Sequence, residues 1–555
     1  MILQAARSVH NHLIVQPFRD LHGFLAHSVE QFSLSFMLII GVTYFLQGFR
    51  GYAFGDGIIW FFSDIFGLDP GPTQLYMSTI YLTWNIKMLY GLAFDNFPLF
   101  GRKDKPWMVV SGVLSFFGFL ALGAPVLTPN PDATTVWFFL ALMGLAMSDV
   151  IADAMVVKEA RRAGEVGGAN LQSFCWILSS MGGIVGRPLA GFINGEDGSG
   201  SRVLLGGVYS ALSLLGCAVT LLHRETRVKE GWSLARFGGQ LTRLLQAIVG
   251  NRLVWLPMTW IVLNQAIVPE VSAAMNFWKK DVIDIGADKK AYIDTVGDMF
   301  GILGLVLYTR HFKRTPFALL FFWTQIAVAL FALTDLVLVY RLNLAMGLSD
   351  EFFLIGSGTI INTLYSFQGM PFLVLAAQLC PKDIEATFYA AMMSLGNIGG
   401  NIGTLYGGYL LEALHVVRLS ESGTDVAVTG VVAANGTSSA VREERYDFTN
   451  LPLVLWIRVV SMLASAVFVF WMVPNRPEEV ASEAVKEGKG ETEEEGESVN
   501  LVQTRMRGRS VGEAVMDEGE EDGELERGGA SARLRVRSPA PKGVNKGDYF
   551  RVEDE

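Results

Sequence analysis

The chain has 555 residues, of which 51% are hydrophobic and only 18% are charged. Soluble domains carry roughly 25% charged residues, so this composition leaves too little polar surface for a soluble protein of this length. The net charge of −10 is concentrated in residues 474–555, which hold 21 acidic and 13 basic residues, and it does not indicate a nucleic-acid partner.

Twelve apolar segments approach the ~20 residues that a helix needs to cross the hydrocarbon core of a bilayer. In chain order they are 33–48 (extending towards Phe62), 73–95, 107–127, 135–157, 168–193, 203–222, 253–278, 292–309, 316–340, 352–378, 386–413 and 452–473. We therefore predict an all-α membrane protein with twelve transmembrane helices in two six-helix halves.

Lys and Arg gather in alternate loops, which favours cytoplasmic termini because basic loops stay on the inner side. The predicted regions are a cytoplasmic N-terminal segment (1–32), a first half (33–222), a basic cytoplasmic linker (223–251), a second half (252–473) with an external loop (414–450), and a disordered acidic cytoplasmic tail (474–555). The external loop carries a glycosylation sequon at Asn435.

Glycines cluster in the fifth predicted span, around Gly182 and Gly186, and again in the eleventh, around Gly403 and Gly407. Small residues let membrane helices approach closely, and repeated halves around a central site are typical of secondary transporters. Ordinary helix packing explains each glycine cluster equally well, but the matched placement favours a transporter.

The segment GLAFDNFPLFGRKDK, residues 91–105, resembles the signature loop of the major facilitator superfamily. The matching positions are Gly91, Asp95, Arg102 and Lys103. This resemblance implies the fold of that superfamily and a role in conformational gating, in which Asp95 pairs with basic residues in only one orientation.

A longer pattern is similar to the folate–biopterin transporter family within that superfamily. It comprises TWNIKMLYGLAFDNFPLFGRKDKPW, DVIADAMVVKEARRAGEVGGANLQSFCW, GGIVGRPLAG and YFLQGFRG. The resemblance implies a secondary transporter of folate, biopterin or related pterins, with proton symport. It is sharp over residues 43–195 and thinner in the second half. Met88 stands where the family usually has Pro, which predicts a straighter second helix.

Lys87, in the same span as Trp84, is costly to bury without a partner, at roughly 3 kcal/mol near the middle of a membrane helix. It either binds an anionic substrate, pairs with Asp149 or Asp153, or snorkels to the surface. Asp149 and Asp153 share one helix face and cannot both ionise cheaply. They could carry a proton, recognise a pterin edge, or pair with basic residues at the inner mouth.

Further candidates for substrate or proton binding lie in both halves. Arg187 would clamp a carboxylate or pair with an aspartate. Gln172, Ser173 and Trp176 open the fifth span, where a flat heterocycle could stack on the indole, although core packing is nearly as plausible for the tryptophan. The second-half candidates, each of which could instead make an interhelical hydrogen bond, are Glu270, Gln368, Asp294, Asp298, Asn397 and Asn401.

Other classes are less favoured. Zinc-protease (HExxH), nucleophile-elbow (GxSxG) and P-loop motifs are absent from the sequence, so we expect no enzyme activity, no cofactor and no metal. The expected partners are a small-molecule substrate, protons and the lipid bilayer of a plasma membrane or of a plastid or vacuolar envelope. Alternatives are another small organic anion or amino-acid-like solute as substrate, and a non-transporting receptor on the same scaffold.

Overall fold

The computed structural model describes residues 32–194, 201–222, 225–228, 231–312, 315–378, 385–417 and 446–473. The chain divides into two compact units, Met1–Lys486 and Glu487–Glu555, and every described residue belongs to the first. The predicted N-terminal segment (except its last residue), most of the external loop with Asn435, and the acidic tail lie outside the described residues.

The described residues form helices, without a named strand. The long helices are α3 (Leu34–Trp60), α4 (Pro70–Asn85), α5 (Lys87–Asn96), α6 (Lys105–Leu122), α7 (Pro131–Asn194), α8 (Arg202–Thr220), α9 (Leu234–Val249), α10 (Arg252–Ala266), α11 (Ser272–Ile283), α12 (Ala287–Leu307), α13 (Phe317–Val339), α15 (Asp350–Gln378), α16 (Glu385–Ala413) and α17 (Leu451–Val467). Shorter pieces are η2 (Phe61–Ile65), η3 (Pro125–Leu127), η4 (Tyr308–Phe312), α14 (Leu342–Ala345) and α18 (Val469–Met472).

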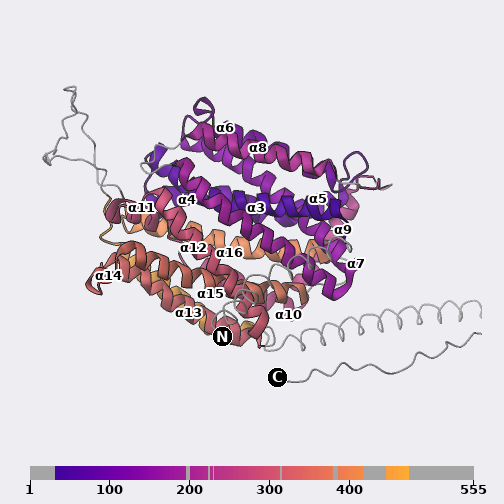
Figure 1. Ribbon diagram of the computed structural model, residues 1–555. Coiled ribbons are helices and arrows are strands. Elements are labelled where there is room, and N and C mark those ends of the chain that lie inside the picture. The colour runs from indigo at the N-terminus through magenta and orange to yellow at the C-terminus, as the bar shows by residue number, and fades with distance from the viewer. Residues whose placement is uncertain are drawn as a thin grey trace, which may run out of the picture. The chain divides into compact units, whose positions relative to one another are not determined.

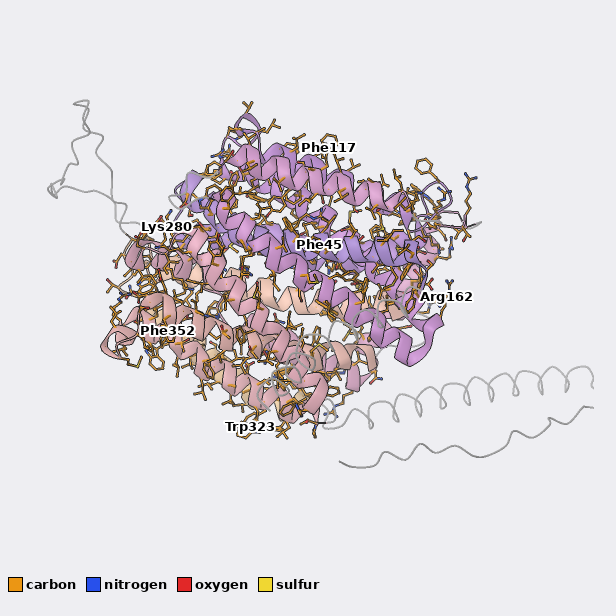
Figure 2. All side chains as sticks on the ribbon, viewed as in Figure 1. Phe45, Phe117, Arg162, Lys280, Trp323 and Phe352 are labelled. Carbon is orange, nitrogen blue, oxygen red and sulfur yellow. The ribbon has the colours of Figure 1, made fainter. Side chains whose placement is uncertain are left out.

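Seven segments of these helices are each long and apolar enough to cross a membrane. Side chains on the flanks agree with a lipid environment: Phe117 and Trp323 are exposed and lie at opposite edges in Figure 2. The labelled charges Lys280 and Arg162 lie instead towards opposite ends of the helices. Large exposed apolar side chains on the flanks with charges at the ends fit a protein whose helices span a bilayer.

Helix α7 supplies two antiparallel arms. Asp149 of α7 contacts Gln47 of α3, and Gly182 of α7 lies against Phe45, which also belongs to α3. In a straight helix, residues 149 and 182 would be about 50 Å apart at 1.5 Å per residue, so the chain must turn back between them. The arms Pro131–Glu159 and Phe174–Ile193 correspond to the predicted fourth and fifth spans.

Two predicted spans are interrupted in the structure. The predicted seventh span, 253–278, is wrong as a continuous helix, because it breaks between α10 and α11 at Ile267–Val271. Pro269 explains this break, since proline lacks an amide donor and disfavours helical geometry in the residue before it. The predicted second span breaks at Ile86, between α4 and α5, so the expectation that Met88 gives a straighter helix is also wrong.

The matched glycines make matched contacts. Gly182 and Gly186, on the second arm of α7, touch the backbone of α3. Gly403 and Gly407 on α16 touch the backbone at the α10–α11 break in the same way. A Cβ atom on Gly182 would lie 2.1 Å from the Phe45 carbonyl oxygen, and one on Gly407 would lie 1.8 Å from that of Glu270. Each pair of helices therefore packs at a distance that only glycine permits. Figure 1 shows α16 in the middle of the unit, with α6 and α8 along one side and α13 along the other.

We predict that Gly182→Ala and Gly407→Ala each destabilise the protein, because the new methyl group forces two helix backbones apart. Melting temperatures of the purified protein in detergent measure the effect, expected at about 1–3 kcal/mol. Gly207→Ala on α8 is the matched control, since its Cβ would meet no atom within 4 Å. Equal melting temperatures for all these variants would contradict this packing.

Candidate functional site

A buried ion pair joins Lys87 to Asp149, two of the candidate residues of the first half. Lys87, at the start of α5, donates to the Asp149 carboxylate on the first arm of α7. Lys87 is 6% exposed and Asp149 is 4% exposed. The Lys87 ammonium also lies 4.2 Å from the centroid of the Trp84 ring. A cation that is paired with a carboxylate and stacked on an indole offsets much of its cost of burial.

Helix α3 completes this cluster with two polar side chains. The Gln47 amide donates to Asp149, and the Tyr44 hydroxyl donates to Asp153 at 2.5 Å. The other amide atom of Gln47, its carbonyl oxygen, is buried without a hydrogen-bond partner among the described residues. The two carboxylates therefore differ in kind: Asp149 faces a cation, whereas Asp153 faces a neutral hydroxyl.

Side chains of α16 form hydrogen bonds with backbone groups beside this cluster. The Met88 amide, which in a regular helix would donate to the Trp84 carbonyl, donates instead to the Ser394 hydroxyl at 3.0 Å. The Trp84 carbonyl accepts from the Asn397 side chain at 3.2 Å. Two side chains one turn apart on α16 thus replace one helical hydrogen bond, which explains why the helix breaks next to Lys87.

The predicted gating residues lie at the end of α5 and in the loop that follows. Asp95 accepts a hydrogen bond from Thr387 of α16 at 3.3 Å, and Lys103 acts on it electrostatically. Gly91 lies between Val150 and α16, and it lines a small cavity with Lys87, Asp95 and Asp153. The Nε–H of Arg102 is buried and has no partner among the described residues.

Glu225, in the linker, holds the loop that follows α5. Its carboxylate accepts hydrogen bonds from the backbone amides of Lys103, Asp104 and Lys105 at 2.7–2.8 Å. These amides open α6, where the helix dipole favours a negative charge. The linker therefore fixes the position of the loop that contains Arg102 and Lys103.

Arg187 meets the aspartates of the other half. From the second arm of α7 it donates to Asp298 at 2.9 Å and to Asp294 at 3.3 Å, both on α12. Lys290 also pairs with Asp294. Of the two readings of Arg187 from the sequence, the structure shows the pairing with aspartate, across the contact between α7 and α12.

The second-half candidates line two further cavities. Gln368 on α15 donates to Gln325 at 2.8 Å and lines a cavity of about 360 Å³. Glu270, at the α10–α11 break, lines both this cavity and a second one of about 340 Å³. Its carboxylate accepts from the Ser272 amide at 2.8 Å. Asn401 is buried in α16, and its carbonyl oxygen has no partner among the described residues.

Some predicted residues do not join these groups. Trp176 is 43% exposed and lies outside the linings of the cavities described here. The side chains of Gln172 and Ser173 lie outside the part of the structure that is described. Lys158, one of the basic residues near the inner mouth with which Asp149 and Asp153 were expected to pair, instead contacts Asp104 at 3.1 Å.

Sequence reasoning missed four polar residues that the structure places at these sites: Tyr44, Gln47, Asp335 and Arg458. The signal for the charged pair was available, because an ionisable residue inside an apolar span is by default a functional candidate. Tyr44 and Gln47 lie in the YFLQGFRG segment that resembles the family pattern, but neutral polar residues are common in membrane helices and only the fold reveals their partners.

We predict that Lys87→Met and Asp149→Asn each lower the stability of the protein by roughly 3–5 kcal/mol, because each leaves one buried charge without its partner. The double variant should recover much of the loss. Thermal unfolding in detergent is the measurement. The more exposed ion pair of Lys158 and Asp104 supplies the control, because Lys158→Met should lower the stability by less than about 1 kcal/mol. Single variants that are as stable as the wild type would contradict a buried pair.

The chain is similar to known proteins over most of its length. The model of the BT1 family matches residues 47–492. The probable folate-biopterin transporter 4 of Arabidopsis thaliana is 26% identical over 69% of this chain and 90% of its own length. The folate-biopterin transporter of Synechocystis sp. is 29% identical over 69% of this chain and 76% of its own.

The fold is that of the major facilitator transporters. The crystal structure of a D-xylose-proton symporter superposes with a TM-score of 0.57, at 12% identity, over 80% of this chain and 98% of the other. The relatives are transporters, so the chain is a multi-pass membrane transporter and not an enzyme. Since the family model covers most of its length, the chain belongs to the BT1 family.

Proposed function

We propose that this protein moves folate, biopterin or related pterins across a membrane by alternating access, coupled to protons. The observation that carries the proposal is the buried cluster of Lys87, Asp149 and Asp153, held by α3, α5 and α7. Secondary transporters keep costly buried charge where a substrate or an ion must be loaded and released. The folate-biopterin transporters among the relatives supply the substrate class.

Similar glycine contacts in the two halves support an architecture of twelve transmembrane spans in two six-helix halves. The fifth predicted span packs on the first through Gly182, and the eleventh packs on the seventh through Gly407. Contacts between the halves run along α4, α5 and α16, from Gly71 beside Glu412 to Asp95 beside Thr387, and between α7 and α12, where Arg187 meets two aspartates. Two similar halves that meet along few helices are suited to rocking about a central site.

Proton coupling is assigned to Asp153. Asp149 already has the Lys87 ammonium as its partner. Asp153 lies one turn away, has a neutral hydroxyl as its partner, and lines the cavity that reaches Asp95. Binding a proton at Asp153 removes the repulsion between two nearby carboxylates, so it is the cheaper of the two to neutralise.

Gating is assigned to the far end of the same cavity. Asp95 and Gly91 contact α16 in this structure, and we expect both contacts to be lost when the two halves separate at this end. Arg102 and Lys103 lie in the adjoining loop and offer cationic partners for Asp95 in another arrangement. A contact made in one state and lost in the other biases the equilibrium between them.

Uptake of labelled folate and biopterin into proteoliposomes tests this function. We predict that the wild type accumulates at least one compound, faster at acidic than at neutral external pH, because protons drive the symport. Asp153→Asn should abolish the pH dependence, since the amide cannot take up a proton. Lys87→Ala should abolish uptake altogether.

Asp132→Asn is the matched control for this experiment. Asp132 also accepts a hydrogen bond from a tyrosine, Tyr76, at 2.7 Å, but at an exposed position in the first turn of α7. This variant should keep the pH dependence of the wild type. Transport of another organic anion, with neither pterin carried, would leave a transporter but overturn the substrate. A correctly inserted protein that carries no solute would favour a receptor.

A further inference from the structure

Arg458 of α17 lies where the two second-half cavities meet. It is one of the residues, with Glu270, that line both of them. Its guanidinium donates to Asp335 of α13 at 3.3 Å and also makes a side-chain hydrogen bond with Tyr365, while Glu270 acts on it electrostatically. The Nε–H is buried and has no hydrogen-bond partner among the described residues. The arginine therefore has donor capacity that the described protein groups do not use.

The larger cavity has the chemistry of a site for a flat heteroaromatic ring. Its walls include Trp260, Phe321 and Phe372, with Tyr365 exposed over 42% of its surface. Aromatic faces stack on planar rings, and the same cavity is lined by side-chain amides. The lining amides belong to Asn264, Gln265, Gln325 and Gln368.

These amides are partly fixed by the protein itself. Gln368 donates to Gln325, which in turn donates to Ser465 at 3.0 Å, and Ser465 donates to the Asn264 carbonyl oxygen at 2.7 Å. Each amide group offers two donors and an acceptor with two lone pairs, so these hydrogen bonds use only part of the capacity of the amides. The remaining donors and acceptors are suited to the polar edge of a ring such as a pterin.

The smaller cavity is suited to a negatively charged group. Lys279 and Lys290 line it together with Arg458, and two carboxylates, Glu270 and Asp335, lie among them. The first-half wall comes from α3 and α4, with Gly55 and Tyr81. A ligand that fills both cavities would thus place a ring among the amides and a charged tail among the cations.

We infer that Arg458 is the specificity residue of a two-part substrate site, which takes the carboxylate of a substrate whose heteroaromatic ring occupies the larger cavity. Arg458 pairs with Asp335 and binds the substrate carboxylate through its unused Nε–H and a second N–H, the paired geometry that arginine favours. This inference rests on the proposed function, since it assigns the place where folate or biopterin binds.

Folate and biopterin together test this site, because both carry a pterin ring but only folate carries carboxylates. The readout is the ratio of their apparent affinities for the purified protein, measured by thermal stabilisation at increasing ligand concentration. Arg458→Gln should lower the ratio of folate affinity to biopterin affinity by about tenfold or more, as expected for a lost charge pair. Arg458→Lys, which keeps the charge, should lower it less.

Arg458→Gln leaves Asp335 without its ion-pair partner. The double variant Arg458→Gln/Asp335→Asn also lacks the Arg458 charge, but it leaves no unpaired carboxylate. It should show the same lowered ratio with better stability. Arg341→Gln is the matched control, since Arg341 pairs with Asp350 at 2.8 Å, outside the linings of both cavities. This control should keep the wild-type ratio.

The outcomes separate this inference from the proposed function. A wild type that binds both compounds, with a ratio that the Arg458 variants leave unchanged, overturns the role of Arg458 and leaves pterin binding intact. Binding of biopterin without folate does the same. A wild type that binds neither compound overturns both the substrate class and the two-part site.

Discussion

The burial of Lys87 beside Asp149 is the constraint on which much of the first half depends. An ammonium group in the middle of a membrane helix is tolerated only when a partner arrives from another helix. Asp149 supplies that partner from α7, Gln47 supports it from α3, and Trp84 covers it from the preceding turn. Helices α3, α5 and α7 are thereby fixed relative to one another, and Asp153 is placed one turn from the pair with Tyr44 as its neighbour.

Close helix packing at glycines positions the helices that carry and surround the Lys87–Asp149 pair. The second arm of α7 approaches α3 closely through Gly182, and the first arm meets Tyr44 and Gln47 of the same α3 helix. In the other half, the contact of Gly407 with the Glu270 carbonyl holds the α10–α11 break, and so sets the border between the two cavities at Arg458. Close packing and charge placement are therefore coupled in both halves.

Much of the arrangement could be predicted from the sequence, because hydrophobicity and glycine spacing report on membrane spans and close contacts. The Lys87 and Asp149 cluster was also accessible, since buried charge in an apolar run is rare. The break at Ile86 was not, because its hydrogen bonds come from α16, about 300 residues away in sequence. Arg458 was overlooked although it stands in an apolar run, and only the fold reveals that Asp335 and two cavities surround it.

The opened turn at Trp84 and Met88 ties the backbone hydrogen bonding of this helix to the position of α16. Ser394 and Asn397 supply the hydrogen bonds that this turn gives up, so a movement that draws α16 away removes both partners at once. In an apolar surrounding, the least costly response is for the Met88 amide to bond the Trp84 carbonyl and restore a regular helix. Straightening would turn Lys87, the residue in between, relative to Asp149. Helix geometry and charge pairing would then change in a single step.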